Sequence, residues 1–372
     1  MLTLGINTIN NFVRNLKTKK KGFKGFFLKP FLYFCLVLAL NSCSYKSIDK
    51  PRLGYLLNIT HALPIIAIEE GLFDEYHVEH YLSGGYLLNA LMSGNIDIAY
   101  IGPGPYINAI NKGVPLEVMS VSAVGANSFV VSDQALEKNN FKIKKIAVPQ
   151  FGNTQDLLAR SFVKRFNDKL KNKEKISKTL LDLVDALEDD KTVSFVQEPE
   201  FIAINPSELE ILLHKNVIDA AFVAEPWGSI LSQRGYKNLT QELTKTTLIN
   251  TFAGEYQKNL SEEIQYMNSF PATLLVVKQD FYKQHVREID NLLAKQDFVL
   301  DIINFDTQSA VTSIQNHFLK LTKQSLDEES IIQSLNNIEF YSDLNINKLV
   351  ELEDIAYQVK YIRTKKIKGA NT

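Results

Sequence analysis

Residues suited to binding an anion follow a predicted buried strand, in the corner Gly102-Pro103-Gly104-Pro105. The strand is expected over Ile96–Ile101, and a helix is expected to begin near Tyr106. A glycine-rich corner between a buried strand and a helix leaves backbone N–H groups unpaired, and such groups bind anionic ligands. The alternative is an ordinary turn in which Gly and Pro only interrupt regular structure.

The same strand-and-corner pattern occurs a second time, which favours the functional interpretation. When Asp219 is aligned with Asp97, apolar residues 98–101 match 220–223, and the corner falls on Ala224-Glu225-Pro226-Trp227. Two copies predict two similar lobes. Because ligands of open parallel sheets lie beyond the carboxyl ends of the strands, the lobes would share a cleft. Chance similarity between two αβ units is the alternative.

The second corner places the only tryptophan of the chain beside a carboxylate. Glu225 and Trp227 are therefore predicted to contribute a hydrogen-bonding acid and an aromatic wall to the cleft. The alternative for Trp227 is packing at the edge of a domain. Glu225 could pair with an ammonium group of a ligand, or it could hydrogen-bond to the protein itself.

A third helix start carries more polar side chains than a single cap requires. Asn153, Thr154 and Gln155 follow a predicted strand over 146–148 and precede an amphipathic helix over 157–164. Asn153 or Thr154 is expected to cap this helix and to leave its first N–H groups free for an anion. Asp156, in the first turn, interacts favourably with the helix dipole, but its carboxylate would repel an anion if it pointed into the cleft.

Two further corners in the first half are predicted to face the ligand. Asn58, Thr60 and His61 lie between a strand over 53–57 and a helix over 62–70, where they could cap the helix or contact a ligand. His61 fits either role. Gly84 and Gly85 end a strand over 76–82 and open a helix over 86–93.

The titratable residues of this strand do not form a metal site. His77 and His80 are three residues apart, so they project from opposite faces of a strand. The only cysteines are Cys35 and Cys43, both near the N-terminus. The body of the chain therefore lacks a disulfide framework, a structural zinc cluster and a catalytic thiol. No metal, cofactor or catalytic residue is predicted.

The N-terminal segment is predicted to be a secretory signal, residues 1–42. It holds seven basic and no acidic residues, followed by an apolar run over 31–40 that is too short to span a bilayer. Cys43 follows this run, as in the cleavage box of bacterial lipoproteins, where that residue becomes lipidated. Residues 43–52 would then be a lipidated tether. An uncleaved anchor helix, or a plain signal, is the alternative.

Composition indicates a globular chain of two domains. The 372 residues are 45% hydrophobic and 22% charged. Without residues 1–42 the net charge changes from −1 to about −8, so non-specific nucleic-acid binding is excluded. An anion would have to be held by local dipoles and a few donors.

The order of the predicted elements gives the domain boundaries. Residues 53–141 would form the first part of lobe 1, closed by strands over 116–123 and 128–132. Residues 142–235 would form lobe 2, with an exposed charged insertion over 167–191. Residues 236–372 would return to lobe 1 through a strand over 272–277 and end in helices.

Five separate segments resemble the nitrate/sulfonate/taurine type of solute-binding protein that serves ATP-driven importers. They cover most of residues 51–300 in matching order: Gly54–His61, Glu70–Phe73, Gly94–Pro103, Pro149–Asp156 and Ile218–Trp227. The resemblance implies an α/β fold, a two-lobed periplasmic-binding-protein-like clamp of type II with two chain crossovers and a helical C-terminus. The insertion over 167–191 and a longer segment over 250–270 depart from the family pattern.

The resemblance also implies the site and the partners. The ligand loops would be Asn58–His61, Ser83–Gly85, Gly102–Gly104, Asn153–Gln155 and Glu225–Trp227. The protein would be a monomer on the extracytoplasmic (periplasmic) face, held to the membrane by its lipid. It would deliver a small solute to an ABC permease and its ATPase, and it would catalyse nothing.

The predicted ligand is a small organosulfonate or a related oxyanion. Nitrate, bicarbonate and a thiamine-pyrimidine precursor are alternatives, since the same fold serves several ligands. A basic residue in the cleft would favour an inorganic anion, whereas stacked aromatics such as Tyr100 and Trp227 would favour a planar ring. A pyrimidine synthase on this fold relies on a cysteine-rich site, which this chain lacks after Cys43. A sensor or scaffold lipoprotein is a further alternative.

Overall fold

The computed structural model describes residues 50–133, 141–177, 193–241 and 255–367. The predicted signal peptide, Cys43 and parts of the segments 167–191 and 250–270 lie outside these ranges. The described residues belong to one compact unit that starts at Lys50. Within those ranges, none of the helices combines the length and the hydropathy that a membrane span requires.

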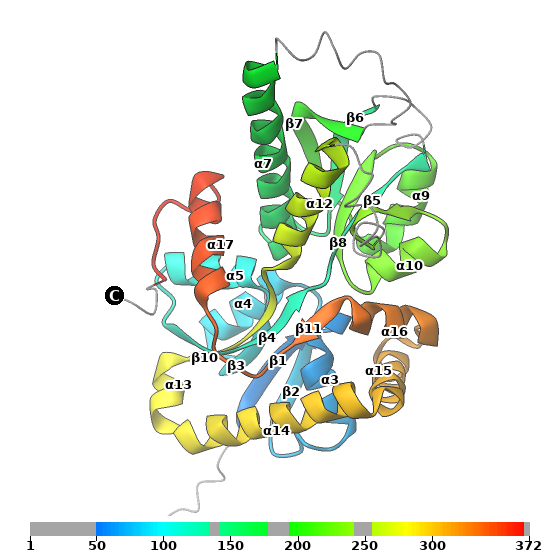
Figure 1. Ribbon diagram of the computed structural model, residues 1–372. Helices are drawn as coiled ribbons and strands as arrows, with labels where there is room; N and C mark the ends of the chain where they lie inside the picture. The colour runs from blue at the N-terminus through cyan, green and yellow to red at the C-terminus, as the bar shows by residue number, and fades with distance from the viewer. Residues whose placement is uncertain (1–49, 134–140, 178–192, 242–254, 368–372) are drawn as a thin grey trace, which may run out of the picture. The chain divides into compact units, whose positions relative to one another are not determined.

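A six-stranded sheet forms the first lobe (Figure 1). Its order is β11-β4-β10-β3-β1-β2, in which β1 is parallel to β2 and β3, and β10 is antiparallel to β3 and β4. The strands are β1 (Arg52–Leu56), β2 (His77–Tyr81), β3 (Ile98–Ile101), β4 (Leu116–Gly125), β10 (Pro271–Lys278) and β11 (Ile338–Phe340). The return to this sheet through β10 is confirmed.

A five-stranded sheet forms the second lobe, in the order β7-β6-β8-β5-β9. Here β6 is parallel to β7 and β8, and β5 is antiparallel to β8 and β9. The strands are β5 (Asn127–Val131), β6 (Phe141–Val148), β7 (Val193–Ala203), β8 (Ala220–Ala224) and β9 (Lys237–Asn238).

The two sheets repeat one arrangement around the two aligned aspartates. The N–H of Asp97 bonds to the carbonyl of Arg52 at 2.9 Å, and the N–H of Asp219 bonds to that of Lys145 at 3.0 Å. The carbonyls of the two aspartates accept N–H groups of Lys278 and Ser132 from the antiparallel neighbour. The short sequence match therefore marks equivalent positions in two similar sheets.

Helices cover both faces of each sheet. In the first lobe, α3, α14 and α15 pack on one face, and α4 and α5 pack on the other. In the second, α7 and α12 lie on the side opposite to α9 and α10. The helices are α3 (Ala62–Glu69), α4 (Gly84–Ser93), α5 (Pro103–Asn111), α7 (Thr154–Ser177), α9 (Leu209–His214), α10 (Trp227–Gln233), α12 (Glu255–Asn268), α13 (Gln279–Gln284), α14 (Val286–Phe305), α15 (Thr307–Thr322), α16 (Glu328–Asn336) and α17 (Asn347–Gln358), with short 3₁₀ helices η1 (Ile59–His61) and η2 (Pro206–Glu208).

The chain passes from the first sheet to the second between β4 and β5. Gly125 and Ala126 have positive φ there, +85° and +65°. The N–H of Gly125 bonds to the carbonyl of Phe270, just before the chain re-enters the first sheet through β10. The two crossovers thus lie side by side, as in a two-crossover clamp.

Two predicted assignments to the first lobe are wrong. The segment after residue 235 does not return at once, because β9 pairs within the second sheet and α12 packs against α7. The strand over 128–132 is the other. Its register pairs Phe129 with Phe222 of β8, so the strand belongs to the second sheet. The reason is the change of direction at Gly125 and Ala126, which turns the chain out of the first sheet before Ser128. Positive φ at two successive residues is typical of a tight turn. In this chain the turn carries the backbone from the first sheet to the second.

One apolar core is continuous between the two sheets. The same cluster contains Leu274 and Val276 of the first sheet and Phe129 and Phe222 of the second. A second cluster under α3, α14 and α15 belongs to the first lobe alone, and a third under α9 and α10 belongs to the second. The strands β3 and β8 are buried along both faces, which is why their sequences are continuous apolar runs.

Candidate ligand-binding cavity

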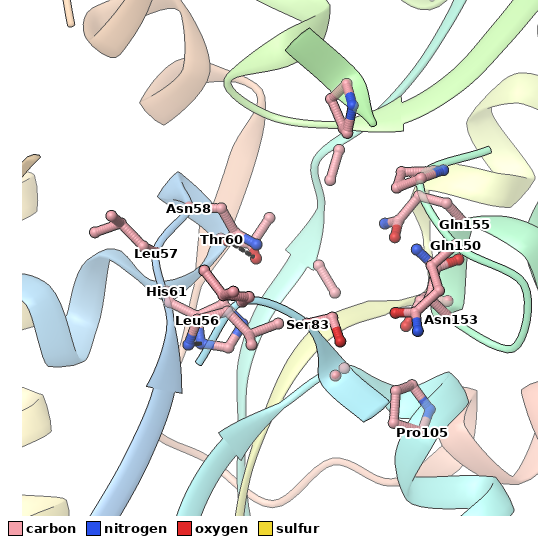
Figure 2. A pocket seen from close by; sticks show the side chains of 18 of the residues that line it. Leu56, Leu57, Asn58, Thr60, His61, Ser83, Pro105, Gln150, Asn153 and Gln155 are labelled. Carbon is pink, nitrogen blue, oxygen red and sulfur yellow. Dashed lines mark hydrogen bonds between the residues drawn. The ribbon is translucent and has the colours of Figure 1, made fainter. Parts of the chain in front are cut away.

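A cavity of about 500 Å³ lies where strands of both sheets end (Figure 2). Its walls come from the residues after β1, β2, β3, β6, β7 and β8, which is where ligands of open α/β sheets bind. The volume falls in the range of pockets that enclose small organic ligands. The lining residues are Leu56, Leu57, Asn58, Thr60, His61, Leu82, Ser83, Gly84, Tyr86, Gly102, Pro105, Pro149, Gln150, Asn153, Thr154, Gln155, Asn205, Pro206, Ala224, Glu225, Trp227 and Ala272.

The cavity gathers ten of the thirteen residues that the sequence analysis assigned to a ligand. Three others, Gly85, Pro103 and Gly104, do not line it. The assembled residues are Asn58, Thr60, His61, Gly84, Gly102, Asn153, Thr154, Gln155, Glu225 and Trp227. Their contact with a ligand stays a prediction, but residues far apart in sequence do share one hollow.

The corner Gly102–Pro105 is not an open anion receptor. Helix α5 begins at Pro103 rather than near Tyr106, and Pro103 and Pro105 have no N–H to offer. The N–H of Gly104 donates to Thr154 Oγ1 at 3.2 Å. Proline at the first helical position is common, so the corner extends the helix backwards instead of exposing donors.

Gly104 instead brings two helix starts into contact. A Cβ added to this residue would stand 2.7 Å from the backbone nitrogen of Thr154 and 2.8 Å from the carbonyl carbon of Asn153. Only glycine permits that approach, because backbone atoms cannot move aside as a side chain can. The role of Gly104 is therefore to place α5 against α7.

Two other helix starts keep free N–H groups at the cavity. Ser83 caps α4 by accepting the N–H of Tyr86, and the N–H groups of Gly84 and Gly85 have no partner among the described residues. In α7, the N–H groups of Thr154 and Gln155 are likewise without a partner in the described part of the chain. Both helix starts can therefore donate to an anion.

The cap of α7 is Asn153, one of the two predicted candidates. Its Oδ1 accepts the N–H of Asp156 at 2.8 Å. The carboxylate of Asp156 bonds to the N–H of Gly152 and to Arg160, and it does not line the cavity. The acidic residue in the first turn thus supports the helix without opposing an anion.

Several polar side chains have used their acceptor atom within the protein and still have a donor available. The Oδ1 of Asn153 is occupied by the cap, Oδ1 of Asn58 accepts the Thr60 hydroxyl at 2.6 Å, and Oδ1 of Asn205 accepts the N–H of Ser207. Each NH₂ group has no partner among the described residues. Figure 2 shows Asn58 and Thr60 on one side of the cavity, and Gln150 and Asn153 on the other.

His61 also has one polar atom bonded within the protein and one donor available. Its Nδ1 accepts the N–H of Leu56 at 3.2 Å, so the neutral ring carries its hydrogen on Nε2. Burial lowers the pKa of this imidazole from 6.5 to about 3, which keeps it neutral near pH 7. The residue is 1% exposed and lines the cavity, and its Nε2–H has no partner among the described residues.

Glu225 is held by the protein on both carboxylate oxygens. Oε1 accepts from Asn337 Nδ2 at 2.8 Å and from Ser128 Oγ at 3.3 Å, while Oε2 accepts from the N–H of Ser229 at 2.9 Å and from Ser334 Oγ at 3.3 Å. The side chain is completely buried, and burial raises its pKa. Of the two predicted roles, the structural one is observed.

The aromatic wall differs from the prediction. Trp227 lines the cavity, but Tyr100 does not, because its ring is completely buried and its hydroxyl donates to Gln296. The second aromatic residue of the lining is Tyr86. Successive residues of β3 point to opposite faces of the sheet, and Tyr100 points into the core under α14.

Other lining residues were missed by the sequence analysis. Gln150 lies within the recognised motif before α7, and Asn205 and Pro206 follow β7. An Asn-Pro pair after a strand is a turn signal, so the corner rule that found the other loops also applies there. Leu82 and Tyr86 carry no comparable signal, since a leucine and a tyrosine near a strand end are ordinary core residues.

Charge in the cavity is sparse. Among the described lining residues there is neither a lysine nor an arginine, and Glu225 is the one acid. Across the described ranges, no group of three or more His, Cys, Asp or Glu side chains is placed to hold a metal ion. Hydrogen-bond donors and apolar side chains are what the cavity offers a ligand.

Comparison with known families places the chain. Residues 48–296 match the model of the NMT1-like family. The chain belongs to this family. Every lining residue of the cavity, from Leu56 to Ala272, lies within the matched range.

The chain is also similar to individual proteins. A candidate binding protein of Brucella abortus (strain 2308) is 28% identical over 140 residues, 36% of this chain and 43% of that protein. The chain therefore matches less than half the length of this curated relative.

Solved structures confirm the fold of this chain. The periplasmic aliphatic sulphonate binding protein SsuA from Escherichia coli superimposes with a TM-score of 0.54 at 14% identity, over 85% of this chain and 94% of that chain. The periplasmic nitrate-binding protein NrtA from Synechocystis PCC 6803 gives 0.51 at 16% identity, over 80% and 73%. The expected two-lobed periplasmic-binding-protein fold is confirmed.

Proposed function

We propose that this protein is the solute-binding component of an ABC importer and that it captures a small organosulfonate in the cavity between its sheets. The lobes would close on the ligand about the paired crossovers at Gly125 and Phe270. The protein would then deliver the solute to a permease and its ATPase. It binds its solute and does not convert it.

The observation that carries this proposal is the surplus of donors without cations. Asn58 and Asn153 each have the side-chain oxygen bonded to the protein and an NH₂ group left, and His61 has Nε2–H left. The starts of α4 and α7 add backbone N–H groups. A sulfonate has three acceptor oxygens and no donor, so its chemistry is complementary. Neutral donors hold an oxyanion through charge-assisted hydrogen bonds, which are stronger than neutral ones.

The volume and the lack of cations argue against nitrate or bicarbonate. A cavity of about 500 Å³ is much larger than a small inorganic anion fills. The described lining residues also include no lysine or arginine. A planar heterocycle such as a pyrimidine is the second candidate, favoured by the half-buried ring of Trp227 in the wall.

The proposal includes the position of the protein in the cell. A lipid on Cys43 would hold it at the extracytoplasmic face as a monomer, with residues 43–52 as the tether. Radiolabelled palmitate incorporation that is lost in Cys43→Ser is the expected result; labelling that persists would contradict the anchor.

The decisive experiment is a thermal-shift screen of the purified protein, followed by calorimetric titration of every solute that raises the melting temperature. Alkanesulfonates, taurine, nitrate, bicarbonate and pyrimidines form the panel. A ligand that binds only the folded protein raises the melting temperature, and a sulfonate is expected to do so. A response to a pyrimidine with none to any oxyanion would replace the sulfonate by the second candidate.

The variant Asn153→Asp tests the donor argument directly. Aspartate is as good a helix cap as asparagine, so α7 keeps its start, but the outward NH₂ becomes a carboxylate oxygen. Affinity for the sulfonate is expected to fall at least tenfold, about 1.4 kcal/mol, while the free energy of unfolding changes little. An unchanged affinity would show that this side chain does not face the anion.

A further inference from the structure

The carboxylate of Glu225 is unavailable to a ligand. Four polar groups lie within hydrogen-bond distance of it, and the two shortest bonds come from N–H groups of Asn337 at 2.8 Å and Ser229 at 2.9 Å. Its side chain has no exposed surface, although the residue borders the cavity. A cationic group of a ligand would have to displace these donors before it could reach an oxygen.

Large apolar side chains stand exposed on the opposite wall. Leu82 is 88% exposed and Tyr86 is 63% exposed, and both line the cavity at the start of α4. Trp227 and Pro206, both half-buried, contribute from the second lobe. Covering such apolar surface with a ligand favours binding, by a free energy in proportion to the area removed from water.

We propose that the solute carries an uncharged, apolar or aromatic group behind its oxyanion, and that this group lies against Leu82, Tyr86 and Trp227. The inference rests on the proposed function, because it describes the remainder of the same ligand. An aminosulfonate such as taurine is excluded as the preferred solute. Its ammonium group would lose water beside apolar side chains without gaining an open carboxylate, and an unpaired buried charge is costly.

The test compares matched ligands on the purified protein by calorimetric titration. Taurine and 1-propanesulfonate have nearly the same shape and differ in an ammonium group in place of a terminal methyl group. We expect 1-propanesulfonate to bind at least tenfold more tightly than taurine, and benzenesulfonate to bind at least as tightly as 1-propanesulfonate. Methanesulfonate, which has almost no apolar group, is expected to bind more weakly than either.

Two variants locate the apolar group. Trp227→Ala is expected to weaken benzenesulfonate at least fivefold and methanesulfonate less than twofold. Because Trp227 is half-buried, the melting temperature of the Trp227→Ala variant is measured in parallel. Tyr86→Ser changes a side chain that is 63% exposed, so folding is retained while the same selective loss is expected.

The outcomes separate this inference from the proposed function. Taurine binding as tightly as 1-propanesulfonate would overturn the inference and leave the sulfonate-binding function standing. A uniform loss of all three sulfonates in Tyr86→Ser would also overturn it. Binding of a pyrimidine with no sulfonate binding at all would overturn the proposed function, and the inference with it.

Discussion

Single side chains at the cavity hold the fold with one polar atom and leave another polar atom available to the proposed ligand. Asn153 caps α7 with its oxygen and presents its nitrogen, and Asn58 accepts the Thr60 hydroxyl and presents its nitrogen. Fixing the oxygen fixes the orientation of the amide, so the donor is already positioned before the ligand arrives. Such preorganisation reduces the ordering cost of binding.

His61 gives the clearest pH dependence. Its pKa is lowered to about 3 in the folded protein by burial, so between pH 6.5 and that value the unfolded chain binds a proton that the folded chain does not. The contribution of the neutral ring to the free energy of unfolding is fully present above pH 6.5, and it decreases as the pH falls below that value. The expected slope from this residue alone is about 1.4 kcal/mol of unfolding free energy per pH unit.

The measurement is urea unfolding at several pH values for the wild type and for His61→Gln. The difference between the two pH profiles isolates His61, because burial also lowers the pKa of His317, which both proteins retain. The wild type is expected to lose stability faster than the variant below pH 6.5. Parallel profiles would mean that His61 is not held neutral in the folded protein.

Local chemistry explains which single residues could be predicted. The cap at Asn153 follows from residue type and position beside a helix, so the sequence was sufficient. The partners of Glu225 are not local: Asn337 is 112 positions further along the chain and Ser128 is 97 positions back. The sequence neighbours of Glu225 therefore give no sign that its carboxylate is already hydrogen-bonded to distant donors.

At the scale of elements, the corners after the strands build the cavity, and their roles differ. The starts of α4 and α7 keep N–H groups for a ligand, whereas the start of α5 is consumed in the contact between Gly104 and Thr154. The sequence predicted that all three face the ligand, because all three have glycine or a capping residue after a strand. The start of α5 differs because Pro103 and Pro105 have no N–H and because the N–H of Gly104 donates to the Thr154 hydroxyl. That hydroxyl lies on another element, α7.

The strand over 128–132 shows the same limit for an element. The sequence correctly predicted a strand there, but the sheet to which it belongs depends on the crossover at Gly125 and Ala126. The repeated pattern around Asp97 and Asp219 was more informative, since equivalent residues occupy equivalent places in both sheets. Repetition within one chain constrains topology where a single segment does not.

Glu225 also joins the second lobe to α16, an element that packs with the first lobe. Ser334 and Asn337, at the end of α16, both donate to it. Glu225→Gln is expected to keep the folded stability at pH 7, because it removes a buried charge and its amide can still be paired: the oxygen accepts the N–H of Ser229, and the NH₂ donates to Oδ1 of Asn337 once that side chain has rotated. Glu225→Ala is expected to lose at least about 2 kcal/mol, because several buried donors are left without acceptors.

Chemical denaturation of both variants provides the test, with Glu200→Ala as the control. Glu200 is an exposed carboxylate on β7, so its removal is expected to change the free energy of unfolding by no more than about 0.5 kcal/mol. Equal losses in Glu225→Gln and Glu225→Ala would show that the negative charge, rather than hydrogen-bond acceptance, holds the corner to α16.

The whole molecule is expected to unfold as one body in spite of its two sheets. A single apolar cluster holds Leu274 and Val276 from the first sheet together with Phe129 and Phe222 from the second. The crossovers are bonded to each other through Gly125 and Phe270, so loss of one sheet exposes the core of the other. A shared core makes partial unfolding nearly as costly as complete unfolding.

Differential scanning calorimetry of the purified protein, with and without the sulfonate found in the screen, tests this cooperativity. One transition is expected, with a calorimetric enthalpy equal to the van't Hoff enthalpy. At a ligand concentration a hundred times the dissociation constant, the whole transition should move upward by the equivalent of about 2.7 kcal/mol, because the ligand contacts both lobes. Two transitions, only one of which moves with ligand, would mean that the sheets fold independently and that the cavity belongs to one lobe alone.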